Sequence, residues 1–324
     1  MAKLCPIGVV GVWRLPAKLM LINLLSRQRH EVPLTSVIGG AGGRFENTAH
    51  AEPTPTVAAC RRGRRTAVRA LATVLLVPAL PLSAQARMAL ATAINRTARF
   101  RALSQRTAKV YGQLYLNVGA ARARDALEHT RRQVHSGFED MDRQSWPPEV
   151  ARLLADVRRN ADRLDALTAQ APTKEGFQAV SAQADQMLAA ANTTTEALER
   201  LAQAPTARLV NTAGRQRMLS QRLAKNYELL AAGLDSRTVR EQMTGDADEF
   251  QRALAQLNKA PISTPAIRSA LELGQAQWVF FEAALKRQPD PRGLENVATT
   301  SERLLEVTDS LTSLYEVALQ DVLG

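Results

Sequence analysis

The chain has 324 residues, of which 45% are apolar and only 4% aromatic. Its Ala- and Leu-rich composition favours an all-α fold over a sheet, and its length suffices for about two domains. The net charge of +11 is uneven, because residues 1–86 carry a surplus of +8 and residues 87–324 only +3. We therefore expect no nucleic-acid binding, which requires a basic face on the folded part.

The first 86 residues are interpreted as a leader and an export signal. Residues 1–60 have no helical or strand period, and we expect a disordered or over-extended leader. Residues 61–86 combine an arginine cluster, the apolar run ALATVLLVPALPL and a terminal A-x-A sequence, a pattern typical of a signal peptide. We predict cleavage near Ala86 and a periplasmic mature protein, exported by either the general or the twin-arginine route. Both cysteines, Cys5 and Cys60, precede this point, so the mature chain holds no disulfide.

Proline, glycine and capping residues then divide the mature chain into about four helical segments per half. After a first helix in each half, we predict second helices near 120–142 and 236–259, third helices at 148–170 and 264–287, and fourth helices at 174–203 and 291–322. Thr264 before Pro265 and Asp290 before Pro291 are typical of an N-cap followed by proline at the first helical position.

The first helices of the two halves contain a repeat. The segment INRTARFRALSQRTAKVY from Ile94 recurs as VNTAGRQRMLSQRLAKNY from Val210, with ten of eighteen positions identical and a constant offset of 116. A further match at an offset of 117 relates residues 172–177 to 289–294. We predict tandem duplicated antiparallel four-helix-bundle units, 87–204 and 205–324. They form either two bundles or one continuous bundle, depending on whether Pro205 breaks or kinks the joining helix.

One face of each repeated helix carries a cation and an amide among small residues. On a helical wheel this face holds Arg101 and Gln105 in the first copy, and Gly214, Arg217 and Gln221 in the second. The guanidinium fork of Arg matches planar oxyanions, and a buried Arg requires a negative partner. The pattern therefore indicates either a site for a small anion or a structural pair with an acidic side chain on a neighbouring helix.

A second polar set lies about 120° round the same helices, and we treat its members as secondary candidates. A solvated face or inter-helix hydrogen bonds would explain it as well as a ligand would. Its members are Asn95, Arg99, Arg106, Asn211, Arg215 and Arg222.

The other prominent side chains of the mature chain indicate no chemistry. We expect Tyr111, Tyr227, Leu103 and Leu219 in the core, and His129 and His135 on the surface. Without a repeated carboxylate, a thiol or a set of His residues at ligand spacing, the sequence predicts no enzyme, no metal site and no cofactor.

The pattern [IV]-N-x-x-[AG]-R-x-R-x-L-S-Q-R-x-A-K-x-Y resembles the PilJ-type domain, the periplasmic N-terminal sensor of type IV pili chemotaxis transducers. It is more distantly similar to the P-box of nitrate/nitrite sensor kinases such as NarX. This resemblance implies an anion-binding arginine at Arg217 and, through the repeat, at Arg101, and the second copy is the better candidate because it matches the pattern more closely. We further hypothesise that the two arginines converge on one anion.

The expected partners are a small anion, a protein of the cell envelope or an inner-membrane receptor, and a second copy in a homodimer. The alternative is a purely structural helical interaction protein, associated with pilus or chemoreceptor components, that binds no ligand.

Overall fold

A computed structural model describes residues 82–234 and 236–323, and every secondary-structure element in these ranges is a helix. The helices are α1 (Leu82–Tyr115), α2 (Ala120–Asp142), α3 (Pro148–Thr168), α4 (Lys174–Ala202), α5 (Pro205–Ala231), α6 (Arg237–Asn258), α7 (Pro265–Leu285) and α8 (Pro291–Leu323). The all-α prediction is confirmed. The predicted leader and residues 61–81 of the predicted signal peptide lie outside the described residues, while α1 runs through residues 82–86.

Local signals in the sequence explain the helix starts. The Thr264 hydroxyl accepts the backbone N–H of Ile267 at 3.2 Å, and the Asp290 carboxylate accepts that of Gly293 at 2.7 Å. Both predicted caps are therefore confirmed, and each satisfies a backbone donor that the first turn leaves unpaired. Helix α4 ends before Gln203, whose backbone is left-handed, and α5 starts with Pro205 at its first position. Pro205 therefore begins a new helix rather than bending a continuous one.

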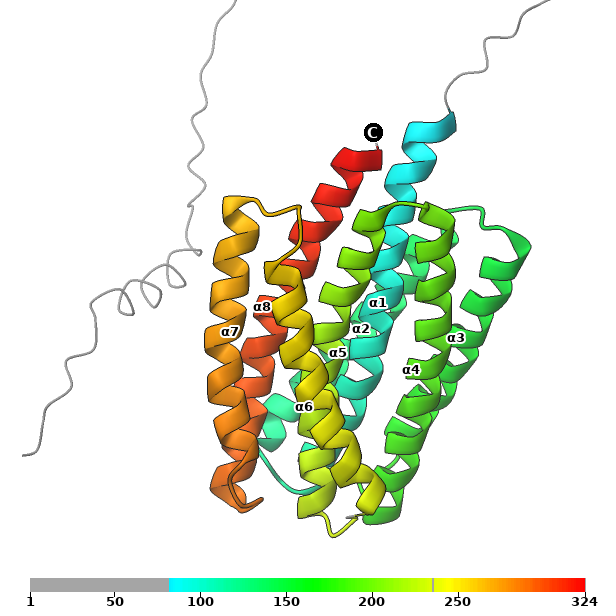
Figure 1. Cartoon of the computed structure of the whole chain (residues 1–324). Coiled ribbons are helices and arrows are strands. Elements are labelled where there is room, and N and C mark those ends of the chain that lie inside the picture. Colours follow the sequence, from blue (N-terminus) through cyan, green and yellow to red (C-terminus); the bar gives the residue numbers. More distant parts are fainter. Residues whose placement is uncertain (1–81, 235, 324) are drawn as a thin grey trace, which may run out of the picture. The chain divides into compact units, whose positions relative to one another are not determined.

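Four long helices form the centre of the bundle, and the other four cover it (Figure 1). Helices α1 and α5 pack against each other and lie parallel, while α4 and α8 run antiparallel to both. On the outside, α2 packs on α1, α3 on α4, α6 on α5 and α7 on α8. We call α1–α4 the first half and α5–α8 the second half.

The hydrophobic core runs through both halves without interruption. Buried residues from all eight described helices belong to one cluster, in which Ile94 and Val210 are completely buried. Tyr111 and Tyr227, each 1% exposed, donate to backbone carbonyls in the loops before α4 and α8, namely those of Ala171 and Gln288. The predicted core positions are thus confirmed, and the two halves share one interior.

No helix in the described ranges has a stretch that is both apolar and long enough to cross a lipid bilayer. The exposed positions of His129 and His135 also agree with the sequence.

Candidate functional site

The two motif helices pack closely where Ala98 faces Gly214, which are equivalent positions of the repeat. A methyl group added to Gly214 would lie 2.8 Å from the Cβ atom of Ala98, closer than two carbon atoms normally approach. The same point lies 3.2 Å from Nη2 of Arg217 and 3.5 Å from Nη2 of Arg101. The absence of a side chain at Gly214 therefore brings both guanidinium groups to the crossing of α1 and α5.

The charge of Arg217, which is 1% exposed, is neutralised by a carboxylate of the protein itself, although its Nε has no hydrogen-bond partner. Its Nη1 lies 2.5 Å from the Asp309 carboxylate on α8, and its Nη2 donates to the side-chain oxygen of Asn95 at 2.8 Å. Burial lowers the pKa of the Arg217 guanidinium, and the negative charge of Asp309 opposes that shift. Arg99 shares the same carboxylate at 2.7 Å, so Asp309 neutralises two cations.

Arg101 is completely buried, yet it forms no ion pair with any described residue. Its Nη1 donates to the side-chain oxygen of Asn192 at 2.9 Å, its Nη2 donates to the backbone oxygen of Asn211 at 3.2 Å, and its Nε has no partner. Burial and the nearby charges of Arg215 and Arg217 lower the pKa of the Arg101 guanidinium to about 9, although Glu196 and Glu199 act in the opposite direction. Arg101 therefore stays cationic at neutral pH and is held by neutral groups.

The contrast between the two arginines comes from a single position of the repeat. Asn192 on α4 and Asp309 on α8 are 117 residues apart, which is the offset that relates these two helices. Each stands opposite the motif arginine of its own half, at similar distance. The first half thus has an amide where the second half has a carboxylate.

A surface cavity of about 420 Å³ lies beside Arg101. Helices α4, α5 and α6 contribute its walls together with the end of the Arg101 side chain. The charged and amide groups around it are Asn192, Glu196, Asn211, Arg215, Gln216, Glu249, Arg252 and Gln256. Because Arg215 is paired with Glu249, Arg101 is the buried cation of this cavity that makes no direct ion pair with a described carboxylate, although Glu196 lines the same cavity.

The two glutamines of the predicted site lie one turn farther along their helices and are buried. Gln105 donates to the Asp185 carboxylate at 3.0 Å, and Gln221 donates to the Ser301 backbone oxygen at 3.1 Å. The carbonyl oxygen of each amide has no hydrogen-bond partner. Neither side chain lines the cavity beside Arg101. Gln105 and Gln221 are thus placed between helices rather than beside the guanidinium groups.

The comparisons with known proteins concern mainly the second half. Residues 202–300 match the family model described as "Type IV pili methyl-accepting chemotaxis transducer N-term", abbreviated PilJ. The matched segment is a PilJ domain by this comparison and comprises 99 of the 324 residues. No match was found among curated proteins or among solved structures. The matched residues cover α5, α6, α7 and the first part of α8, and the PilJ family is a sensory and signalling family rather than an enzymatic one.

The secondary candidates of the PilJ domain make inter-helix contacts, as do their equivalents in the first half. Each donates to a carboxylate on another helix, so the whole set consists of charged or polar ties across the bundle. The pairs are Asn95 with Glu316, Arg99 with Asp309, Arg106 with Glu302, Asn211 with Glu199, Arg215 with Glu249 and Arg222 with Asp246. The sequence left open whether these residues are solvated or bonded between helices, and the structure shows the bonded arrangement.

Two lysines of the repeat cross from one half to the other. Lys109 contacts the Glu302 carboxylate of α8, and Lys225 lies 2.7 Å from the Asp185 carboxylate of α4. Both lysines are at most 1% exposed, and burial lowers the pKa of Lys225 while Asp185 opposes that shift. Asp185 and Glu302 are again equivalent at the offset of 117. These reciprocal pairs connect the second half to the first half.

The acidic partners on α4 and α8 were not predicted from the sequence. A signal for them existed, because the offset of 117 aligns Asp185 with Glu302, Asn192 with Asp309 and Glu199 with Glu316. The motif helices alone do not contain it. In the described ranges, no group of three His, Cys, Asp or Glu side chains is arranged to hold a metal ion.

Proposed function

We propose that the chain is an exported sensory protein that binds a small anion beside Arg101 and presents the bound state to a membrane signalling partner. The observation that carries this proposal is a completely buried guanidinium without a carboxylate, next to a cavity of about 420 Å³. A buried charge is stabilised by an opposite charge, and Arg presents a planar pair of donors that fits nitrate, nitrite or a carboxylate.

The second half supports the same interpretation, because its equivalent arginine has a carboxylate as partner. There, Asp309 places a carboxylate oxygen 2.5 Å from Arg217. In the first half the neutral amide of Asn192 takes the place of that carboxylate, so the charge of Arg101 has no ion-pair partner. We therefore assign the ligand-binding charge to Arg101 and treat Arg217 as a cation that the protein satisfies internally. The backbone oxygens of Asn95 and Asn211 hold the two guanidinium groups near the same crossing, so an anion bound by Arg101 would act on the contact between α1 and α5.

An equilibrium titration with nitrate, nitrite and acetate tests the anion site. Thermal unfolding of the wild-type chain should shift upward with at least one of these anions, by about 2.7 kcal/mol at a hundred times the dissociation constant. In Asn192→Asp, the first half receives the carboxylate of the second half. We expect this variant to lose the response to anions, because the new carboxylate neutralises Arg101, while the loss of the hydrogen bond from Asn192 to Glu196 offsets the gain in stability without ligand.

Gln186→Glu is the matched control, because it adds the same charge to an exposed position of the same helix. It should keep the response to anions. If no anion stabilises the wild type at millimolar concentration, or if Asn192→Asp responds as the wild type does, the anion site is refuted.

Export is tested separately by N-terminal sequencing of the protein recovered from a periplasmic fraction. We expect the mature chain to begin near Arg87. Recovery of an uncleaved chain from the cytoplasm alone would contradict the export part of the proposal without affecting the anion site.

A second candidate is a structural interaction protein without a small ligand. The pairing of Arg217 with Asp309 favours it, because a motif arginine is there used entirely for packing between helices. Capture of an envelope partner by the immobilised chain distinguishes the two functions. Sensory function predicts that capture changes when the anion is added, and a structural function predicts capture that is independent of every anion.

A further inference from the structure

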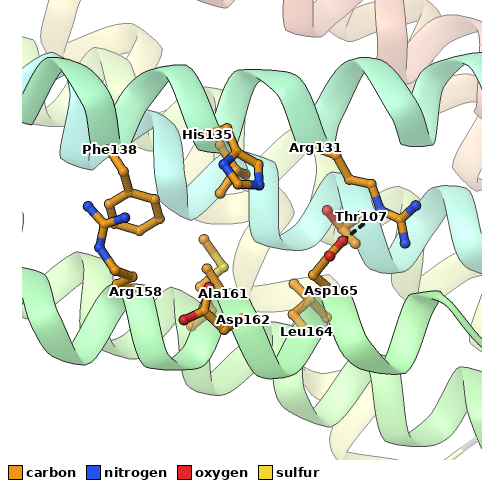
Figure 2. A pocket seen from close by; sticks show the side chains of 11 residues that line it. Thr107, Arg131, His135, Phe138, Arg158, Ala161, Asp162, Leu164 and Asp165 are labelled. Carbon is orange, nitrogen blue, oxygen red and sulfur yellow. Dashed lines mark ion pairs between the residues drawn. The ribbon is translucent and has the colours of Figure 1, made fainter.

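A cleft lies between α2 and α3 in the first half. The cavity beside Arg101, in contrast, is lined mainly by α4, α5 and α6. The volume of the cleft is about 70 Å³, and it is open to solvent. Its inner surface is mainly apolar and is contributed by Val134, Phe138, Ala161, Leu164 and Met187. Figure 2 shows the side chains of α2 and α3 facing each other across it. Helices α2 and α3 contact each other only sparsely, which leaves the cleft accessible.

The equivalent region of the second half is filled by aromatic rings. The repeat offsets place Phe250 at the position of Val134, Trp278 at that of Ala161 and Phe281 at that of Leu164. The Trp278 indole stacks on Phe250 with ring centroids 4.3 Å apart, and Phe281 meets it edge-on at 6.0 Å. The same fold therefore accommodates an indole between its second and third helices, where the first half has Ala161 beside the ring of Phe138.

Charged residues close the two ends of the cleft and leave its middle accessible. At one end Arg131 on α2 pairs with Asp165 on α3 at 2.6 Å, as the dashed line in Figure 2 marks. At the other end the Arg158 guanidinium lies 4.3 Å from the centre of the Phe138 ring. Between these ends lie the exposed residues Asp162 on α3 and His135 on α2, and the Asp162 carboxylate makes no hydrogen bond or ion pair with another described residue.

We propose that this cleft binds the aromatic ring of a small cationic molecule, with the ring over Ala161 and the cation next to Asp162. An aromatic ring binds most favourably to an apolar surface that lies next to another ring or a flat side chain. The Asp162 carboxylate then selects a cationic over an anionic substituent. This site shares no residue with the cavity beside Arg101, so it stands independently of the function proposed above.

Titration of the full chain with tryptamine, indole and indole-3-acetate, followed by protein-detected NMR, tests the proposal. We expect saturable shifts confined to α2, α3 and the adjoining part of α4. Tryptamine should bind about two- to five-fold more tightly than indole-3-acetate, the ratio that one exposed ion pair produces. Asp162→Asn should remove this preference and leave the binding of indole unchanged.

Ala161→Trp places in the cleft the side chain that the second half has there, and it should abolish the binding of all three probes. Ala166→Trp is the matched control, since it adds the same ring to an exposed position of α3 outside the cleft. Val134→Phe narrows the opposite wall and serves if Ala161→Trp fails to fold. Absence of saturable shifts at 10 mM probe (about the limit for a weak site), or unchanged binding in the cleft-filling variants, overturns the proposal.

Discussion

The two halves of the molecule agree in how they are tied together and differ in how they neutralise charge. Lys109 and Lys225 each cross to an acidic residue at the same position of the opposite fourth helix. Arg101 and Arg217, in contrast, face Asn192 and Asp309. Features present in both halves specify the scaffold, because both halves must pack against one core. Features present in one half mark where the scaffold has room for something else.

The largest effect is expected when the side-chain acceptor of each motif arginine is removed in turn. Asp309→Ala leaves Arg217 buried without a carboxylate and also removes the partner of Arg99, so we expect a loss of about 3 kcal/mol. Asn192→Ala removes one neutral hydrogen bond from Arg101, and a loss of about 1 kcal/mol is expected. Chemical denaturation of both variants measures the difference. Equal losses would mean that the two arginines are held in the same way.

A second, smaller difference concerns the next arginine of the motif. Arg222 binds both oxygens of Asp246, at 2.7 and 2.5 Å, whereas Arg106 meets Thr130 at the equivalent position and relies on Glu302. Asp246→Ala should therefore cost about 2 kcal/mol, because it leaves a largely buried guanidinium unpaired.

Thr130→Ala leaves the Arg106–Glu302 pair in place and should cost less than about 1 kcal/mol. The same denaturation experiment compares the two variants. If Thr130→Ala destabilises the chain as much as Asp246→Ala does, Glu302 does not hold Arg106 in solution.

Most of the fold could be predicted from the sequence, because local signals determine it. The proline and cap positions located the helix starts, and the spacing of apolar residues located the core faces of the motif helices. The arrangement of the halves was not predictable in this way. The contact between α1 and α5 depends on Ala98 meeting Gly214. Such a close approach of two helices produces no periodic pattern in the sequence of either helix.

The candidate site was predicted only in part, for a related reason. The motif contains the guanidinium groups, and their partners lie about 90 to 120 residues away on helices without a conspicuous motif. Asn192 and Asp309 differ by one polar atom, so the exchange looks minor in a sequence. Its consequence, a buried arginine with or without a counter-charge, appears only when the side chains are placed.

A third test uses Glu228, which stands at the position of Gly112 in the other half. This side chain is 1% exposed, accepts one hydrogen bond from Gln113 and has one oxygen without a partner. Burial raises the pKa of the Glu228 carboxyl well above its usual value, although Lys109 and Gln113 oppose that shift. A group with a raised folded-state pKa favours folding below the unfolded pKa of about 4.3, and its contribution is lost as pH rises through the folded pKa.

Glu228→Gln should therefore stabilise the chain by about 1–2 kcal/mol at pH 8, the range for an imperfectly paired buried polar group. The gain should disappear near pH 4, where the carboxyl is protonated in both states. Denaturation at several pH values measures this dependence. If the gain in stability stays constant from pH 4 to pH 8, it does not come from removing a buried charge.

The smallest expected effect concerns the crossing of α1 and α5, where the halves differ by one methyl group. Gly214→Ala brings a methyl group to 2.8 Å from Ala98, and its overpacking exceeds the gain in helix propensity, so we expect a net loss of about 1 kcal/mol. Ala98→Gly loses about 1 kcal/mol of helix propensity. The double variant again has one methyl group at the crossing and should lie within about 0.5 kcal/mol of the wild type, as a double-mutant cycle would show. A larger loss in the double variant would indicate that the new methyl group crowds the guanidinium groups of Arg217 and Arg101 rather than Ala98.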